Sequence, residues 1–480
     1  RISKGRNIFF RMTPDAKDLC VFAVKRGDIT GRFDVRNLKY SQSQSGKKQE
    51  KVSLGSLTSE EPCYGTSASA IERTDESQPK YIRITDFDDF GIEDNHKFVT
   101  TENYVQKHIL EIGDILFART GGTVGKTYYY DGSIGKSVFA GYCIRFRFDD
   151  KKVLPKFIYW YTKTTAFTNW VKGIQRPSGQ PNINKEEYKS FEIILPDYET
   201  QGKLCAEMDN AEIERKQKLY HANELLHQNP IYLIDRLGLT FDFSATQKIT
   251  YATTVANIEG RIDADYYSPK FSHFRKQIEA LPYRTVSVND ISEKIVSGFA
   301  AGKQDQADNL PEDQRVPHLR PFSITPEGEL SFETKKYVPK SRLKSEDYCK
   351  KNEVIFNNTN SPDLVGKTTV FDSDVLCAAS NHMTRITVKE GVNPYYVAAF
   401  FNVLLSIGYW KLLCTNFNNQ AGVNTDTLKR VKIPLPPKEI QDQIAAELMQ
   451  RRSQANVLRR QAIKEWADAK AQFEKELLGE

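Results

Sequence analysis

The chain has 480 residues, of which 39% are hydrophobic and 27% are charged. This length favours two or three domains over a single core, and the hydrophobic content excludes a disordered chain. The formal net charge is only +6, which by itself identifies neither a strongly basic nor a strongly acidic protein.

No window approaches the apolar length of a membrane span, and the segment RISKGRNIFFRMTPD from Arg1 lacks the apolar stretch and cleavage site of a secretory signal. The seven cysteines are scattered and never spaced as CxxC, which is typical of a reducing compartment and of a protein without structural zinc. We therefore expect a cytoplasmic protein with no membrane association.

In chain order, residues 1–24 form an N-terminal segment and residues 25–198 the first predicted domain. Runs rich in β-branched and aromatic residues, such as YIRITDF from Tyr81 and DILFART from Asp114, predict strands separated by Gly, Asn and Pro turns. Pro155 predicts the first position of a helix, and the short apolar strand FEIILP ends the domain.

A long helix is predicted over residues 199–229, and a linker over residues 230–256. Apolar residues recur along the helix at helical spacing until Pro230, which is predicted to end it. These apolar residues are Leu204, Met208, Ala211, Ala222 and Leu226.

A second domain, predicted over residues 257–437, repeats the first at an offset of about 240 residues. GRFDVRNLKYS from Gly31 matches GRIDADYYSPK from Gly260, KYIRITDF from Lys80 matches PHLRPFSI from Pro317, GDILFARTGGTVGKT from Gly113 matches NEVIFNNTNSPDLVGKT from Asn352, PKFIYWYT from Pro155 matches PYYVAAFF from Pro394, and GQPNINKEEYKSFEIILPDYETQ from Gly179 matches NQAGVNTDTLKRVKIPLPPKEIQ from Asn419. The matches keep one order along the chain. The repeated unit is therefore a whole domain rather than a solenoid repeat.

A second long helix is predicted over residues 438–480, with one apolar stripe running from Ile440 to Leu477. A narrow stripe on a charged helix favours a partner helix, so we expect the two long helices to pair with each other. The alternative is that each helix packs on its own domain.

The segment TGGTVGKT is not interpreted as a nucleotide-binding P-loop. That motif requires Gly where the chain has Thr120, and the second copy has Ser361 there. Moreover, the residues after GK in both copies are β-branched and aromatic, which predicts a strand rather than the helix that a P-loop feeds.

Other catalytic patterns fail on similar grounds. Asp197, Glu214 and Lys216 fit a PD…ExK nuclease spacing, but residues two apart on the predicted helix point to nearly opposite faces. NPYY at Asn393 and LPPK at Leu435 do not complete the motif with which an amino-methyltransferase holds a flipped base. The isolated histidines form no metal motif. We expect no catalytic residue, no metal site and no cofactor.

The repeated landmarks resemble the specificity subunit of type I restriction-modification systems. RIDADYYSP at Arg261, GDILFARTGGTVGK at Gly113, FNNTNSPDLVGKT at Phe356, NQAGVN at Asn419 and the paired LPDYETQ and LPPKEIQ carry the resemblance. It implies an α+β fold with two tandem, similar α/β target-recognition domains. Two long antiparallel coiled-coil-like helices separate these domains in a pseudo-twofold arrangement.

The resemblance also implies a function. Such a subunit is not catalytic: each domain reads one half of a bipartite target in double-stranded DNA, and the helices dock methyltransferase subunits and, through them, restriction subunits. A helix of about 28 residues spans roughly 40 Å, close to one turn of B-DNA. The alternatives are the C-terminal specificity region of a single-chain restriction-methyltransferase, or, from another class, a P-loop ATPase or a nuclease.

Polar loops in both domains supply the candidate DNA contacts, because Arg and Lys suit guanine, Asn and Gln suit adenine, and all of them can bond phosphate. The candidates are Arg83, Arg119, Thr120, Lys126, Arg176, Gln180, Asn182 and Asn184 in the first domain, and Arg320, Asn357, Asn358, Asn360, Lys367, Asn418, Asn419, Gln420 and Asn424 in the second. The alternative is that these residues simply form turns. The matched pairs Lys126/Lys367 and Gln180/Gln420 are interpreted as scaffold or phosphate contacts, since shared residues cannot make two half-sites differ, and Arg83 and Arg320 are candidates for the same role.

Overall fold

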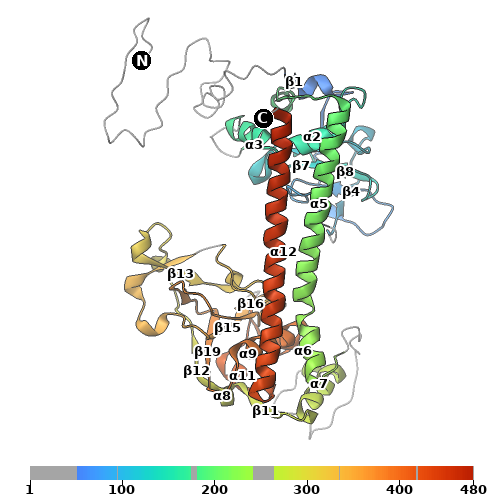
Figure 1. Cartoon of the computed structure of the whole chain (residues 1–480). Helices are drawn as coiled ribbons and strands as arrows, with labels where there is room; N and C mark the ends of the chain where they lie inside the picture. The colour runs from blue at the N-terminus through green and yellow to red at the C-terminus, as the bar shows by residue number, and fades with distance from the viewer. Residues whose placement is uncertain are drawn as a thin grey trace, which may run out of the picture. The chain divides into compact units, whose positions relative to one another are not determined.

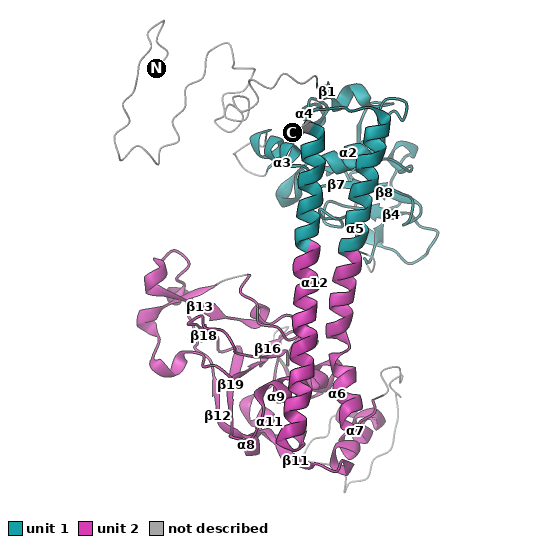
Figure 2. Cartoon of the chain, viewed as in Figure 1, with its two compact units in different colours: residues 1–215, 463–480 teal, residues 216–462 magenta. Residues whose placement is uncertain are grey.

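The computed structural model describes residues 51–93, 96–174, 181–241, 264–333, 336–417 and 420–478 (Figure 1). These residues divide into two compact units, which Figure 2 distinguishes by colour. Unit 1 contains residues 1–215 and 463–480, and unit 2 contains residues 216–462. Each unit therefore combines one mixed α/β domain with parts of two long helices, which confirms the predicted two-domain α+β fold.

The core of unit 1 is an antiparallel four-stranded sheet in the order β2-β9-β6-β7. Its strands are β2 (Cys63–Tyr64), β6 (Ile115–Ala118), β7 (Thr127–Tyr129) and β9 (Cys143–Phe146). Every residue of β6 is fully buried, because this strand lies between two neighbours and both of its faces are covered. The segment DILFART thus contains a strand, as its composition predicts, and the structure places that strand inside the sheet.

Further sheets and short helices complete the domain of unit 1. A second sheet has the order β3-β5-β4-β8, with β4 and β8 parallel, and β1 pairs with β10. These strands are β1 (Val52–Ser53), β3 (Ile71–Glu72), β4 (Lys80–Ile82), β5 (Val99–Thr100), β8 (Ser137–Phe139) and β10 (Glu192–Ile193). The helices are α2 (Pro155–Tyr161), α3 (Thr165–Ile174) and α4 (Lys185–Lys189). Pro155 begins α2, as predicted.

Unit 2 repeats this topology. Its antiparallel core sheet has the order β12-β19-β15-β17, a second sheet has the order β14-β13-β18 with β13 and β18 parallel, and β11 pairs with β22. The strands are β11 (Arg284–Ser287), β12 (Ser292–Ser297), β13 (Arg315–Leu319), β14 (Tyr337–Pro339), β15 (Val354–Asn357), β17 (Thr368–Val370), β18 (Ala378–Ala379), β19 (Met383–Val388) and β22 (Lys432–Leu435). A third sheet, β16-β21-β20, consists of β16 (Thr359–Asn360), β20 (Thr415–Phe417) and β21 (Gln420–Gly422).

The helices of unit 2 surround this core. They are α6 (Asn229–Leu237), α7 (Pro269–Ala280), α8 (Val288–Ile291), α9 (Pro394–Ser406), α10 (Tyr409–Leu413) and α11 (Thr425–Arg430). Asn393 caps α9 with its side chain and Pro394 is the first residue of the helix, as predicted. Pro230 does not simply end a helix: α5 ends at His227 and Pro230 lies in the first turn of α6, where a missing N–H costs nothing.

One pair of equivalent glutamines shows how closely the two domains match. In unit 1, buried Gln201 accepts a hydrogen bond from the Leu154 amide (2.9 Å) and donates one to the Pro196 carbonyl (2.8 Å). In unit 2, buried Gln441 accepts one from the Asn393 amide (2.9 Å) and donates one to the Pro436 carbonyl (2.8 Å). The duplication seen in the sequence is therefore a duplication of hydrogen bonds as well as of strand order.

The two long helices, α5 (Tyr198–His227) and α12 (Lys438–Leu478), pair in antiparallel fashion. In unit 1, Leu204 and Met208 of α5 share a core with Phe473 and Leu477 of α12. In unit 2, the buried cluster Ala222, Leu226 and Ala455 joins the other end of α5 to the middle of α12. The predicted pairing is confirmed. Each helix also packs on a domain, as the alternative supposed, since several of these residues belong to the domain cores.

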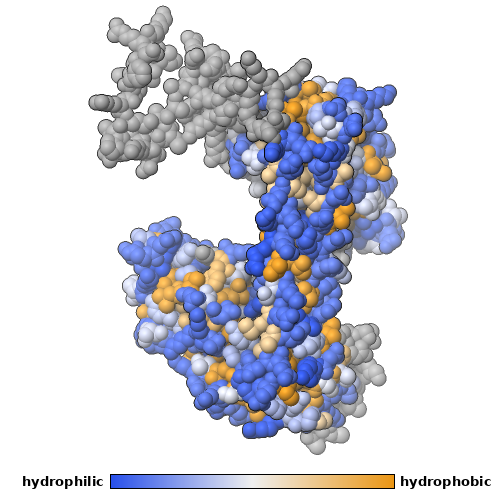
Figure 3. All heavy atoms as spheres, viewed as in Figure 1, coloured by the Kyte–Doolittle hydropathy of each residue, from blue (hydrophilic) through white to orange (hydrophobic). Residues whose placement is uncertain are grey.

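The coloured part of the face shown in Figure 3 is predominantly hydrophilic, with scattered hydrophobic patches. Among the described helices, none combines the length and apolar character that a membrane crossing requires.

Candidate nucleic-acid interface

In unit 1, polar and aromatic side chains gather where β6 and β9 meet their connecting loops. The Arg119 amide, directly after β6, donates to the carbonyl of Tyr142 in the turn before β9 (3.0 Å). The Arg119 guanidinium lies over the ring of Tyr64, 4.8 Å from its centroid, and its Nε is 3.4 Å from Asn182 Oδ1. The stacked ring holds the guanidinium in place, whereas the Tyr142 side chain is 62% exposed.

The equivalent position in unit 2 keeps the backbone and changes the side chains. The Asn358 amide donates to the His382 carbonyl (3.0 Å), as Arg119 does to Tyr142. The Asn358 side chain donates to the Asn381 carbonyl and to Thr384 Oγ1 and accepts from Thr359. One shared loop framework thus presents Arg and Tyr in unit 1 and Asn and His in unit 2.

A second shared feature brings another loop to the same place. In unit 1, Thr120 forms an antiparallel bridge with Asn182. In unit 2, the equivalent residues Thr359 and Gly422 pair in the antiparallel strands β16 and β21. The hairpin β20–β21 is therefore tied to the loop that follows the central strand β15, and exposed Gln420 lies on it.

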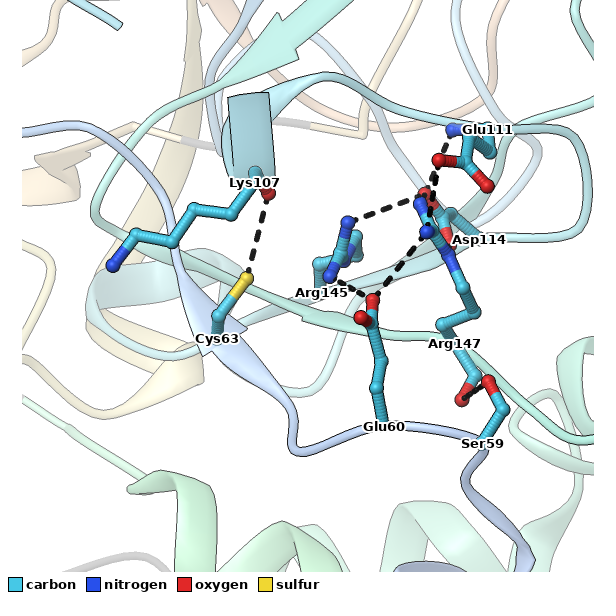
Figure 4. A network of polar contacts seen from close by, with 8 residues as sticks. All are labelled: Ser59, Glu60, Cys63, Lys107, Glu111, Asp114, Arg145 and Arg147. Atoms are coloured by element: carbon cyan, nitrogen blue, oxygen red, sulfur yellow. Dashed lines mark hydrogen bonds and ion pairs between the residues drawn. The ribbon is translucent and has the colours of Figure 1, made fainter. Parts of the chain in front are cut away.

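A buried ion network supports this framework from the other end of the core sheet (Figure 4). Arg147 forms two hydrogen bonds of 2.8 Å with Asp114, and Arg145 forms an ion pair with Glu60. The Asp114 carboxylate raises the pKa of Arg147 above its usual range. In unit 2, Arg385 pairs with Glu353 (3.5 Å), the equivalent of the pair that Arg145 forms with Asp114 in unit 1 (3.9 Å). Because each charge has a partner within the network, these groups stabilise the sheet rather than form a reactive site.

A family model described as the type I restriction modification DNA specificity domain matches residues 50–220 and, a second time, residues 282–465. The chain belongs to this family. It is a specificity subunit of the type I restriction-modification class, and the two matched regions are the two domains described above. The matches do not favour the alternatives of a single-chain restriction-methyltransferase, a P-loop ATPase or a nuclease.

Individual relatives are distant. Over 109 residues, the specificity subunit is 29% identical to the protein of Methanocaldococcus jannaschii described as "Putative type I restriction enzyme MjaX specificity subunit", and the alignment covers 22% of the chain and 26% of that relative. A chain from a structural study of the assembly and conformational transition of the type I R-M system aligns over 90% of this chain and 96% of its own, with 15% identity and a TM-score of 0.49.

Two solved subunits align over 91% of the chain. The HsdS subunit from Thermoanaerobacter tengcongensis is 15% identical, is covered over 99% of its length and has a TM-score of 0.37. The S subunit of the type I system from M. genitalium is 10% identical, is covered over 96% of its length and has a TM-score of 0.43.

Two of the predicted DNA contacts are helix caps in the specificity subunit. Asn184 accepts a hydrogen bond from the Glu187 amide (2.9 Å) while Glu187 accepts one from the Asn184 amide, a capping box at the start of α4. Asn424 accepts from the Thr427 amide (2.8 Å) at the start of α11. Both side-chain oxygens are thus occupied within the subunit.

Several other candidates lie inside the protein. Asn357 is fully buried in β15 and donates to the Leu364 carbonyl (3.2 Å). Lys367 is only 6% exposed, its ammonium group donates to the Ile324 carbonyl, and burial lowers its pKa. Arg83 is not buried, since its side chain is 37% exposed, but it forms an ion pair with buried Asp86 (2.8 Å), which raises the pKa of Arg83. Equivalent residues of the two domains can therefore differ in exposure: Lys126 is half-exposed, whereas Lys367 is buried.

The remaining candidates are more accessible than Asn357 and Lys367, or they lie outside the residues that the structure describes. Arg320 is half-buried at the end of β13, Thr120 is nearly buried, and Asn360 is half-buried with its Oδ1 accepting from the Ser361 amide (2.8 Å). Arg176, Gln180, Asn418 and Asn419 lie outside the described residues.

Sequence reasoning missed the aromatic side chains that lie beside the candidate residue Arg119 and its loop. Tyr142 lies in the segment FAGYCIRF, which resembles one apolar strand, and its exposure arises because Gly141 and Tyr142 form a turn between β8 and β9. The glycine within the apolar run was the signal that could have revealed this turn. Tyr64 carried no local signal, since only its stacking on Arg119 brings it to the candidate site.

Proposed function

We propose that this specificity subunit reads a bipartite target in double-stranded DNA, one half with each domain. In this proposal α5 and α12 dock methyltransferase subunits and, through them, restriction subunits. The chain supplies sequence recognition and carries out no catalysis itself. We expect it to act in the cytoplasm, where its six described cysteines, all free, remain reduced.

The observation that carries the proposal is the combination of an identical framework with different side chains. Strand order, the paired glutamines and the amide bonds of Arg119 and Asn358 are common to both domains. At equivalent accessible positions, however, Tyr142 in the first domain corresponds to His382 in the second. A shared framework with divergent side chains is the arrangement expected of two readers of unlike half-sites.

The contacts that we propose are those that the framework leaves accessible. They are Arg119, Lys126, Asn182 and Tyr142 in the first domain and Asn360, His382 and Gln420 in the second. Arg176, Gln180, Asn418 and Asn419 stay predictions. Candidates that serve as caps or lie buried are assigned to the scaffold, because Asn184, Asn424 and Lys367 hydrogen-bond within the chain and Asn357 is fully buried.

Replacement of Tyr142 by alanine tests the interface. We expect at least about a fivefold loss of affinity for the cognate DNA, on the scale of about 1 kcal/mol for one lost aromatic or base-edge contact. Tyr220→Ala is the matched control, since Tyr220 is also 62% exposed but lies on α5. Equal affinities for the two variants in a titration with labelled duplex would contradict the assigned interface.

An exchange of residues 25–198 for the corresponding domain of another family member tests the two-reader model. We expect the exchange to alter only one half of the recognised motif. A change in both halves would show that the domains do not read independently.

A further inference from the structure

A cleft of 360 Å³ in unit 1 lies beside the loop that follows β6. Three lysines line it: Lys126 on that loop, Lys163 directly after α2, and Lys470 on α12. Its walls include Phe90 and Trp466, whose rings pack edge to face at 5.6 Å. Three cations in so small a space make a strongly positive site within partly apolar walls.

Lys163 is the most unusual of the three because it is only 8% exposed. Its ammonium group donates to the carbonyl (3.2 Å) and the hydroxyl (3.1 Å) of Thr127 and lies 4.4 Å from the centroid of the Tyr159 ring. Burial lowers the pKa of Lys163 to about 8. A buried cation is costly unless negative groups compensate it. Asp89, Glu212 and Asp88 lie near enough to raise the pKa of Lys163, but among the described residues no carboxylate forms an ion pair with it.

The second domain shows that the fold does not require this charge. Asn402 occupies the equivalent position, and its neutral amide donates to the carbonyl of Thr368 (2.8 Å), the equivalent of Thr127. An amide therefore supplies the backbone hydrogen bond for which a lysine is used in the first domain. The second domain forms this hydrogen bond without a charge, so the positive charge of Lys163 is not needed for it.

The other two lysines add to the excess of positive charge. Neither Lys126 nor Lys470 forms an ion pair with any acid in the described parts of the chain, and Lys470 lies close enough to lower the pKa of Lys163. The one carboxylate in the lining is that of exposed Asp89, so the lining itself carries three lysines and one acid. This excess of positive charge among the lining residues attracts an anion.

We propose that this cleft is a phosphoryl-binding site in which Lys126, Lys163 and Lys470 together hold the oxygens of one phosphate group. Lysine ammonium groups bind phosphate as point charges, and partial burial strengthens the attraction because solvent screens it less. As Lys126 lies on the loop that carries Arg119, a phosphodiester of bound DNA is one source of the phosphate. The assignment of the phosphate to DNA rests on the proposed function. A free phosphate or nucleotide would bind the same three lysines independently of that function.

The test uses Lys163→Asn in the full chain, because Asn402 shows that this residue maintains the hydrogen bond. Lys470→Ala is the second variant, and Lys152→Asn, on an exposed lysine outside the cleft, is the control for the lost charge. Duplex affinity is measured at several salt concentrations for cognate and unrelated sequences. Binding of inorganic phosphate and of ATP to the chain without DNA is measured by calorimetry, and urea unfolding confirms that each variant folds.

If the phosphate belongs to DNA, Lys163→Asn lowers affinity about five- to tenfold for both sequences and reduces the slope of log affinity against log salt by about one, whereas the control does neither. If the phosphate is free, wild type binds phosphate or ATP and Lys163→Asn weakens that binding at least fivefold while DNA affinity stays constant. Affinities and salt slopes equal to those of the control, with no phosphate or ATP binding to wild type, would overturn the site. A wild-type chain that binds phosphate but no DNA contradicts the proposed function and leaves the site intact.

Discussion

Replacement of Gln441 by alanine tests whether the duplicated hydrogen bonds hold each domain to α12 and α5. Gln441 is 1% exposed, and alanine would leave the Asn393 amide and the Pro436 carbonyl without their partner. Each of these two unsatisfied buried groups costs about 1–3 kcal/mol, so we expect the free energy of unfolding of unit 2 to fall by about 2–6 kcal/mol. Gln201→Ala should lower that of unit 1 by a similar amount, since Gln201 makes the same two bonds.

The assay is urea unfolding, with hydrogen exchange used to locate the loss of protection in one unit or the other. Gln443→Ala is the matched control: this residue lies two positions further along α12 and is exposed, so we expect a change below about 0.5 kcal/mol. If Gln441→Ala and Gln443→Ala have equal effects, the hydrogen bonds do not stabilise the domain and the reasoning is refuted.

Three further predictions concern unit 2. Burial lowers the pKa of His318 from 6.5 to about 4, so the contribution of the neutral imidazole to stability is complete above pH 6.5 and is lost as the pH falls toward 4. Urea unfolding measured across this pH range should show a loss of about 3 kcal/mol in wild type that His318→Gln abolishes, and an unchanged profile in the variant would contradict this. Gly366 has a φ of +100°, and a Cβ there would meet Trp410 at 2.1 Å. Gly366→Ala should therefore lower the free energy of unfolding by at least about 3 kcal/mol in thermal unfolding, and a change below about 1 kcal/mol would show that the turn can relax. Glu329 accepts hydrogen bonds from α12, including one from Arg459 at 2.7 Å, so Glu329→Gln should destabilise β13 and β14 by about 1–2 kcal/mol, seen as faster hydrogen exchange there but not in unit 1.

The large features of the fold were predictable from the sequence because they depend on patterns that repeat. DILFART and VIFNNT, in matched segments, were each predicted to form a strand, and these strands are β6 and β15. The apolar stripes predicted two paired helices because a hydrophobic stripe must be buried whatever surrounds it. Pro230 was misjudged in part because proline is compatible with the first turn of a new helix as well as with the end of an old one.

The candidate site was less predictable, because residue type does not determine exposure or hydrogen-bond partner. Asn184 was grouped with possible base readers, although the spacing of Asn184 and Glu187 is that of a capping box and could have assigned it to the scaffold. Lys126 and Lys367 occupy equivalent positions, yet only the second is buried against a backbone carbonyl. Such differences arise from contacts between segments far apart in the chain, which a local motif does not contain.

The most direct test of the account is selection of duplexes bound by the full chain from a library of random sequence, followed by sequencing. The account predicts enrichment of a split motif, with two short specified parts separated by a gap of fixed length and free composition. Enrichment of one continuous motif, or of no motif, would contradict the conclusion that the two domains are separate readers of one DNA target.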